Sequence, residues 1–184
     1  MKFKETKIKD NYLVYLNKKN DNRGFFARYF CVKDFSKKKL NTKWVQINNS
    51  LTYKVGTLRG LHFQKKPNEE VKLVRCVRGS IWDVVVDLRK NSKTFGKWYG
   101  EKLTEINRKM MYVPKGFAHG FVSFESNTEI LYLVSDYYAP GTEGTLIWND
   151  PNVGIDWPTT PQIISDKDAK GDKLDKITPI KLKN

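Results

Sequence analysis

The sequence has little of what would mark a membrane protein or a disulfide-stapled domain. No apolar run approaches the roughly 18 to 20 residues that cross a bilayer, and Met1 to Tyr12 is too charged for the apolar part of a signal peptide. Cys31 and Cys76 lie far apart in the chain and form no Cys-x-x-Cys motif. We therefore expect a soluble, cytoplasmic protein with reduced cysteines in or near its core and no membrane partner.

Histidine is equally scarce. The only two are His62 and His119, and no His-x-His pair occurs. A metal-binding β-barrel usually needs several imidazoles together with a carboxylate. We therefore expect no catalytic metal and no other cofactor.

Negative charge is also in short supply. The chain has 34 Lys and Arg against 20 Asp and Glu, which gives a net charge of +14. Such a field attracts phosphate groups, whether in nucleic acid or in a small nucleotide. The basic residues occur in short groups and not as one tract interleaved with stacking aromatics, which disfavours nucleic acid as the partner. These groups are Lys37–Lys39, Lys65–Lys66 and Arg108–Lys109.

What the sequence does contain fits one all-β domain. Its 184 residues are fewer than the roughly 250 at which chains usually split into separate cores. Short runs of β-branched and aromatic residues recur between Gly, Pro and Asn, while helical periodicity is scarce. The pattern predicts a jelly-roll-like barrel. Its strands are expected at Trp44–Asn49, Gly56–Phe63, Val71–Val77, Ile81–Leu88, Trp98–Leu103, Lys109–Val113, Gly120–Phe124, Thr128–Val134 and Thr145–Trp148.

One pairing of strands is predicted directly. The runs Val71–Val77 and Ile81–Leu88 flank Arg78-Gly79-Ser80, and a glycine-bearing turn between two strands is typical of a β-hairpin. A brief helix is expected at Lys33–Lys37, and a short helix or an irregular arm at Ser165–Asp175.

The first histidine falls within a predicted strand. Strand alternation puts His62 on one face with Leu58, Gly60 and Gln64, where Gly60 leaves space beside the imidazole. A small residue next to a histidine suits a pocket, although a hydrogen-bonded strand histidine has the same pattern.

Three further polar residues lie among apolar neighbours on strand faces, namely Lys72, Asp83 and Tyr132. A buried charge is costly unless it is paired or used, so a structural ion pair and a functional pocket both remain open for Lys72 and Asp83. A plain core tyrosine would look like Tyr132. Together with a histidine, these groups can move protons at a carbon atom.

Five stretches, in order and spacing over nearly the whole chain, resemble the dTDP-4-dehydrorhamnose 3,5-epimerase family. They are Asp21–Phe26, Gly56–Gln64, Lys72–Cys76, Pro114–Phe121 and Glu143–Asp150. The resemblance implies a cupin-type jelly roll that works as a homodimer without metal. On this basis we treat residues 1–184 as a single domain, with N-terminal strands and a dimer arm (1–50), a barrel core (51–160) and a C-terminal segment (161–184).

The resemblance also implies roles residue by residue. His62 would be the catalytic base and Asp168 the carboxylate that orients it. Tyr132 would be the acid on the opposite face of the sugar, and Lys72 would lie near the ketone oxygen. The substrate-binding positions would be Arg23, Phe26, Arg28, Gln46, Asn48, Arg59, Asp83, His119 and Tyr138.

Within that set, Arg23 and Arg59 would hold the pyrophosphate of a nucleotide-diphosphate sugar, and Tyr138 would stack on the base. Because family members exchange N-terminal strands, Arg23 and Phe26 would reach into the partner's site. Arg28 stands where the family usually has Glu and cannot accept a hydrogen bond as a carboxylate can, which leaves the identity of the base open.

The implied reaction converts dTDP-4-dehydro-6-deoxy-D-glucose to dTDP-4-dehydro-L-rhamnose by proton abstraction and reprotonation at C3 and C5. The alternatives are an epimerase of a single centre, C3 or C5, and a relative that uses a different nucleotide sugar. A non-catalytic barrel that binds a nucleotide sugar or nucleic acid is an alternative from another class. A metal-dependent cupin dioxygenase is a further one.

Overall fold

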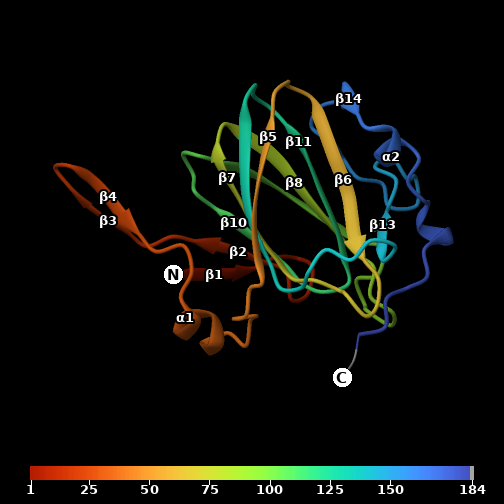
Figure 1. Ribbon diagram of the computed structural model, residues 1–184, viewed down its shortest axis with the longest axis horizontal. Helices are drawn as coiled ribbons and strands as arrows, with labels where there is room; N and C mark the ends of the chain where they lie inside the picture. The colour runs from red at the N-terminus through yellow and green to blue at the C-terminus, as the bar shows by residue number, and fades with distance from the viewer. Residues whose placement is uncertain (183–184) are drawn as a thin grey trace.

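Two antiparallel sheets and a projecting hairpin make up the protein (Figure 1). The computed structural model describes residues 1–182. The strands are β1 (Lys2–Glu5), β2 (Tyr12–Tyr15), β3 (Lys18–Asp21), β4 (Gly24–Ala27), β5 (Gln46–Thr52), β6 (Thr57–Gln64), β7 (Lys72–Arg78), β8 (Ser80–Asp87), β9 (Trp98–Thr104), β10 (Met110–Val113), β11 (Phe117–Ser123), β12 (Thr128–Val134), β13 (Glu143–Thr145) and β14 (Ile163–Ile164). The helices are α1 (Val32–Lys37), α2 (Asp166–Ala169) and the 3₁₀ helix η1 (Leu174–Lys176).

The strand order defines two facing walls. One sheet runs β1-β2-β10-β7-β12-β5, and the other runs β13-β6-β11-β8-β9, with β14 parallel to β6. The strands β3 and β4 pair only with each other among residues 1–182. The expected all-β jelly-roll architecture is therefore confirmed, and the N-terminal strands β1 and β2 are part of its first sheet.

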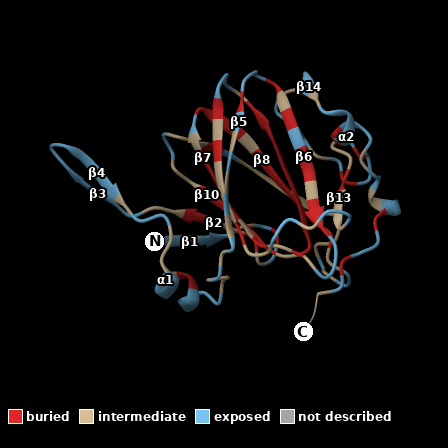
Figure 2. Ribbon diagram, viewed as in Figure 1, coloured by how far each residue is buried: buried red, intermediate tan, exposed pale blue. Residues whose placement is uncertain are grey.

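The core lies both inside the barrel and outside its second sheet. Strand β8 shows why its sequence is almost continuously apolar: Ile81 and Val85 pack inward against β7 residues such as Val74, while Val84 and Val86 pack outward beneath the C-terminal segment. A strand that is buried on both faces loses the apolar and polar alternation of a half-exposed one. In Figure 2, β7, β8 and β11 are accordingly among the most buried strands.

The predicted hairpin is wrong, although both of its strands exist. Strand β7 pairs with β10 and β12 in one sheet, and β8 pairs with β11 and β9 in the other. Gly79 connects them with φ +75°, and a Cβ there would lie 2.6 Å from Thr128 Oγ1. Both strands have an apolar inner face, so placing them in opposite sheets buries those faces against each other across the barrel. A glycine turn in the sequence does not distinguish a hairpin from such a corner.

Most other element predictions are confirmed, with shifted ends. The helix predicted at Lys33–Lys37 is α1, and the C-terminal segment contains α2 and η1. The strand predicted at Thr145–Trp148 is misplaced, because β13 ends at Thr145. Beyond it, Leu146 exchanges backbone hydrogen bonds with Leu61, and the chain then turns toward the C-terminal segment.

The hairpin β3–β4 projects from the barrel as an arm (Figure 1), and this arm is exposed along most of its length (Figure 2). It carries two large apolar side chains, Phe25 and Phe26, which are 44% and 63% exposed. Apolar side chains at this exposure on a two-stranded element have no core of their own to join.

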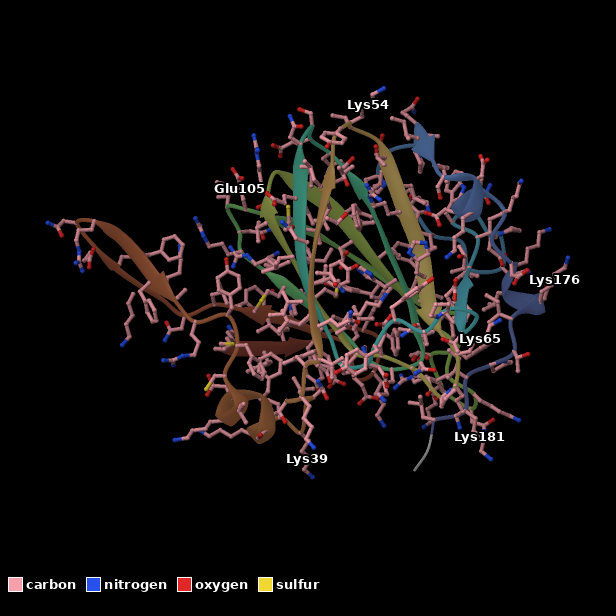
Figure 3. All side chains as sticks on the ribbon, in the orientation of Figure 1. Lys39, Lys54, Lys65, Glu105, Lys176 and Lys181 are labelled. Atoms are coloured by element: carbon pink, nitrogen blue, oxygen red, sulfur yellow. The ribbon has the colours of Figure 1, made fainter. Side chains whose placement is uncertain are left out.

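The positive charge is distributed over the surface. Figure 3 shows Lys39, Lys54 and Lys176 on different sides of the molecule. None of the helices within residues 1–182 has the length and apolar character needed to span a membrane.

Candidate active site

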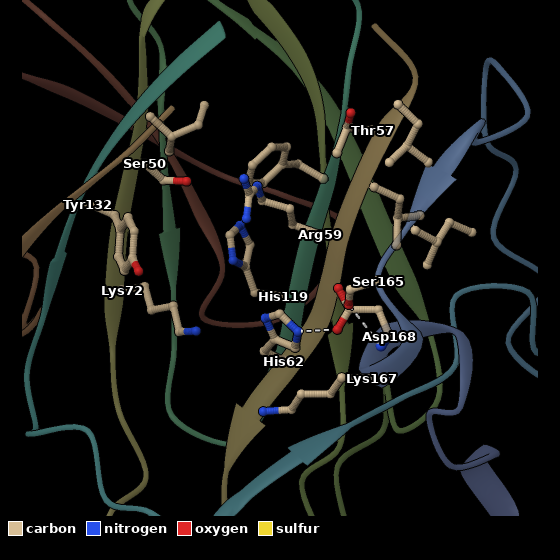
Figure 4. Close-up of a pocket in the computed structure, with 15 residues that line it drawn as sticks. Ser50, Thr57, Arg59, His62, Lys72, His119, Tyr132, Ser165, Lys167 and Asp168 are labelled. Carbon is tan, nitrogen blue, oxygen red and sulfur yellow. Dashed lines mark hydrogen bonds and ion pairs between the residues drawn. The ribbon is translucent and has the colours of Figure 1, made fainter. Parts of the chain in front are cut away.

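A cavity of about 500 Å³ opens between the two sheets (Figure 4). This main cavity is lined by β6 and β11 on one side, by β5, β7 and β12 on the other, and by the segment around α2. A side cavity of about 360 Å³ adjoins it. The two cavities share His62, Lys72, Tyr132 and Lys167.

Strand β6 positions His62 through an irregularity in its pairing with β11. His62 lies opposite His119 and Arg59 lies opposite Phe121, with a register shift between the two pairs. His119 and Phe121 are two residues apart and share a face of β11, so Arg59 and His62 face the cavity together although they are three residues apart. Regular alternation therefore does not hold along this strand, although Leu58 also lines the main cavity as expected.

Gly60 allows this irregularity. A Cβ on Gly60 would lie 2.6 Å from the backbone oxygen of His119 and 2.7 Å from the Cα of Gly120. The glycine therefore permits close approach of the neighbouring backbone, and not only the space beside the imidazole that the sequence suggested.

The histidine of β6 forms a pair with a carboxylate from α2. His62 Nε2 lies 2.6 Å from Asp168 Oδ1, and Asp168 Oδ2 accepts a hydrogen bond from the Gly60 N–H at 3.0 Å. The Ser165 side chain caps α2 by accepting from the Asp168 N–H. Burial alone would raise the pKa of Asp168, but the hydrogen bonds from His62 and Gly60 outweigh it and lower the pKa below its ordinary value. The imidazole is thus held by a buried, ionised carboxylate while 41% of its side chain stays exposed.

A second histidine and carboxylate pair lies deeper. His119 lines the main cavity, and its Nε2 is 2.8 Å from Asp83 Oδ1. The Asp83 side chain is fully buried. Asp83 is not part of the lining formed by residues 1–182, so its expected place on the cavity wall is wrong, and it reaches the cavity only through His119.

The opposite wall carries Tyr132 and Lys72, from β12 and β7 (Figure 4). Lys72 forms an ion pair with Glu70, with Nζ 3.2 Å from Oε1. Burial and then the charge of Glu70 raise the pKa of Tyr132, while Asn48 and Arg59 oppose the rise. The phenol is therefore protonated at neutral pH. His62, Tyr132 and Lys72, for which the roles of base, acid and cation were expected, therefore line one cavity.

Three of the predicted substrate-binding residues line the side cavity. Gln46, Asn48 and Tyr138 all contribute to it. The Tyr138 N–H donates to Gln46 Oε1, and the Tyr138 hydroxyl donates to Glu143 Oε1, each at 3.1 Å. Tyr138 is 60% exposed, so this residue of the side-cavity lining is accessible from solvent.

Three predicted substrate-binding residues lie away from both cavities of the described chain. Arg23 is in the turn of the arm, Phe26 is on β4, and Arg28 follows that strand. Phe26 and Arg28 border a separate hollow beside Met1 and Asp34. A single chain therefore does not bring these three residues to its own His62.

Several lining residues were not predicted from the sequence. Ser50 and Thr57 line the main cavity, Lys167 borders both cavities, and Glu70 and Glu143 line the side cavity. Glu70 could have been predicted from the sequence, because it lies two residues before Lys72 and shares its face in an extended chain. For Ser50 and Thr57, small hydroxyl residues on strands, no comparable signal exists. Within residues 1–182, no group of three or more His, Cys, Asp and Glu side chains could hold a metal ion.

Comparison with known proteins agrees with this geometry. Residues 5–176 match the family model described as dTDP-4-dehydrorhamnose 3,5-epimerase. The dTDP-4-dehydrorhamnose 3,5-epimerase of Sinorhizobium fredii is 41% identical over 175 residues, which cover 95% of this chain and 90% of the relative.

Solved structures give the same result. The dTDP-4-dehydrorhamnose 3,5-epimerase from Elizabethkingia anophelis is 40% identical with a TM-score of 0.92, over 95% of this chain and 97% of that one. The dTDP-6-deoxy-D-glucose-3,5-epimerase from Legionella pneumophila, solved with dTDP-4-keto-L-rhamnose, is 34% identical with a TM-score of 0.92, over 100% and 99%. The chain therefore belongs to the dTDP-4-dehydrorhamnose 3,5-epimerase family, with its cupin-type jelly roll.

Proposed function

We propose that this protein epimerises dTDP-4-dehydro-6-deoxy-D-glucose at C3 and C5 to give dTDP-4-dehydro-L-rhamnose. The observation that carries the proposal is the placement of His62 with Asp168 on one wall of the cavity and Tyr132 with Lys72 on the other (Figure 4). Inversion of a carbon needs a proton removed on one face and delivered on the other, and two walls supply two such groups.

In the first step the base acts. The C4 ketone acidifies the hydrogens at C3 and C5, so a positioned base can remove either one as a proton. When His62 Nε2–H donates to Asp168, Nδ1 carries the free lone pair and takes the proton from carbon. The C–H electron pair moves into the ring to form an enolate, and Asp168 stabilises the imidazolium that results.

In the second step the charge is moved and the carbon is reprotonated. The enolate oxygen is negative, and the Lys72 ammonium offers it a charged donor; loss of one such donor in an acyl-transfer enzyme costs about 3 to 4 kcal/mol. Tyr132 gives its phenolic proton to the opposite face of the carbon. Proton transfer from the imidazolium to solvent, and from solvent to the phenolate, returns both groups to their starting forms. No electrons are gained or lost overall.

Binding of the nucleotide supplies the positioning. Arg59 lies in the main cavity, where its Nε donates to Thr52 Oγ1 and its Nη2 to the backbone oxygen of Leu51. A guanidinium held in this way is set to grip a pyrophosphate. Gln46, Asn48 and Tyr138 would then meet the nucleoside in the side cavity.

The test is proton exchange with solvent. In heavy water the wild-type protein should introduce deuterium from solvent at C3 and C5 of the proposed substrate, measured by NMR or mass spectrometry. Tyr132→Phe should retain substrate affinity within a few fold while losing inversion. Deuterium at only one carbon would indicate a single-centre epimerase. Absence of deuterium at both carbons, with the protein folded and the nucleotide bound, would refute the proposal and leave a binding barrel.

We further propose that the protein is a homodimer whose arms complete each other's sites, with Arg23 and Phe26 reaching the partner's cavity. Two features support this. The arm has exposed Phe25 and Phe26, and the outward face of the edge strand β5 exposes Ile47 by 65% and Leu51 by 38%. In a symmetric dimer, such apolar surfaces of the two chains can bury one another. Arg28 would enter the partner's site with the same arm.

Complementation separates arms that act in the partner from arms that act in their own chain. Mixing Arg23→Ala chains with His62→Ala chains should restore activity, because a mixed dimer contains one site with both an intact arm and an intact base. Sedimentation should give the mass of two chains. A monomer at micromolar concentration, or mixtures that stay inactive after exchange, would contradict the dimer proposal without affecting the epimerase proposal.

We also propose a cytoplasmic location. Its support is that both cysteines are free, Cys76 is buried, and burial raises the Cys76 thiol pKa to about 12. A protein that keeps its thiols reduced suits a reducing compartment.

A further inference from the structure

A carboxylate lies inside the proposed site beside the two groups on its second wall. Glu70 lines the side cavity together with Lys72 and Tyr132. Its Oε1 is 3.2 Å from Lys72 Nζ, and each of the two side chains is only 12% exposed. A pair this sheltered from water is screened far less than a surface ion pair.

The backbone fixes the direction of the Glu70 side chain. Although β7 begins at Lys72, the Val71 N–H donates to Ser135 Oγ at 2.8 Å and the Ser135 N–H donates to the Val71 oxygen at 3.0 Å. The chain therefore continues in contact with the end of β12, and Val71 is buried. Glu70 and Lys72 are then directed to the same side, two residues apart, and are held toward the cavity before any substrate enters.

The surroundings of Tyr132 show why this charge matters. Charged and titratable groups line the cavities from every neighbouring element: Glu70 and Lys72 from the β7 side, Arg59 and His62 from β6, His119 from β11, Lys167 and Asp168 from α2, and Tyr138 and Glu143 from the rim. Strand β5 contributes the uncharged Asn48 and Ser50. Among these groups, Glu70 is the charge that most raises the pKa of Tyr132, after burial itself.

Building on the proposed epimerase reaction, we propose that Glu70 is a positioning residue for its second wall. Its carboxylate holds the Lys72 ammonium where the enolate oxygen forms, and its negative charge disfavours the phenolate form of Tyr132, which lines the same side cavity. One carboxylate thereby acts on both Lys72, which neutralises the enolate charge, and Tyr132, which reprotonates the carbon.

The kinetic test separates position from charge. Glu70→Gln keeps an oxygen that can accept from Lys72 but removes the charge, whereas Glu70→Ala removes both. The controls are Glu69→Gln and Glu69→Ala, one residue away, because Glu69 is buried but lines neither cavity in residues 1–182. We expect Glu70→Ala to lower kcat by about tenfold with a smaller change in KM, since Lys72 acts mainly on charge that develops during the reaction. We expect the alkaline limb of the kcat profile to move to lower pH in both Glu70 variants.

A titration that needs no substrate turnover tests the role of Glu70 independently of the proposed reaction. Tyrosinate absorbance is titrated in each protein and in the same protein carrying Tyr132→Phe, and the difference isolates Tyr132. Removing the Glu70 charge should shift the Tyr132 titration to lower pH, and the Glu69 variants should leave it in place. Wild-type protein that titrates as expected but exchanges no substrate proton would refute the epimerase proposal alone.

Two results would overturn the role of Glu70. One is a Tyr132 titration that stays unchanged in Glu70→Gln while that variant remains folded by circular dichroism. The other is a kcat and pH profile of Glu70→Ala that match those of Glu69→Ala. Rescue of kcat by Glu70→Asp, relative to Glu70→Ala, would support a charge held near Lys72 over a merely structural contact.

Discussion

Two pairs of histidine and aspartate lie at the cavity wall or directly behind it, and they differ in their exposure to water. In the first, 41% of the His62 side chain is exposed and Asp168 comes from a short helix near the C-terminus. In the second, His119 is 10% exposed and Asp83 not at all, and both residues come from the centre of one sheet. The two imidazoles lie directly opposite each other on β6 and β11. The same chemical pair is thus present twice, once accessible to a ligand and once buried in the core.

We infer from this difference that accessibility separates the proposed reacting histidine from a supporting one. His62 has a nitrogen that a substrate can approach, while a late segment of the chain supplies its carboxylate without filling the cavity. His119 and Asp83 fix the floor of the same cavity, because β8 and β11 hold them in adjacent strands. We therefore assign proton transfer to the first pair and shape to the second.

The largest effect should separate the two histidines. His62→Ala should lower the rate of proton exchange at the sugar by about 10²- to 10⁴-fold, the usual contribution of a general base, with nucleotide affinity kept within a few fold. His119→Ala should lower the rate by about tenfold, because it removes a wall and not the base. The measurement is deuterium uptake in heavy water, with stability checked by urea unfolding. Equal losses in both folded variants would erase the distinction between the pairs.

Substitution of the two aspartates should have different effects, one mainly on catalysis and the other mainly on stability. Asp168→Asn should reduce kcat by about 10- to 100-fold, as loss of an orienting partner does, with a smaller loss in the free energy of unfolding than Asp83→Asn causes. Asp83→Asn should instead destabilise the protein by about 1 to 3 kcal/mol, since it disturbs a hydrogen bond in the core. Urea titrations and initial rates on the same samples decide this. A stable Asp83→Asn protein with the larger catalytic loss would reverse our assignment.

The smallest effect is a pH dependence of stability. The pKa of Asp168 is lowered in the folded protein from an ordinary value of 3.8, so its ionised form stabilises the fold above that value. This contribution falls as the pH drops through the lowered folded pKa, where both states bind the proton. The stability advantage of wild-type protein over Asp168→Asn should therefore shrink on acidification below about pH 4. An advantage that is constant over this range would show that the Asp168 charge contributes nothing to stability.

Particular residues show where prediction from sequence succeeded. The strands β6, β7, β8 and β12 were located because runs of β-branched and aromatic residues between turn residues are local information. Strand alternation holds in β12, where Tyr132 shares a face with Ile130 and Val134. It failed at Gly60, where a shift in register against β11 brings Arg59 onto the same cavity wall as His62. The pairing of two strands more than fifty residues apart leaves no mark in either segment alone.

The sequence by itself determined the all-β class and the family motifs, and it singled out the residues proposed for proton transfer, because strand periodicity and motif spacing are properties of neighbouring residues. Only the tertiary structure decided that β7 and β8 lie in opposite sheets, that Asp83 lies behind His119, and that Glu70 faces Lys72 and Tyr132. These outcomes depend on which apolar faces are buried against each other across the barrel. That is a balance over the whole chain, and no short segment contains it.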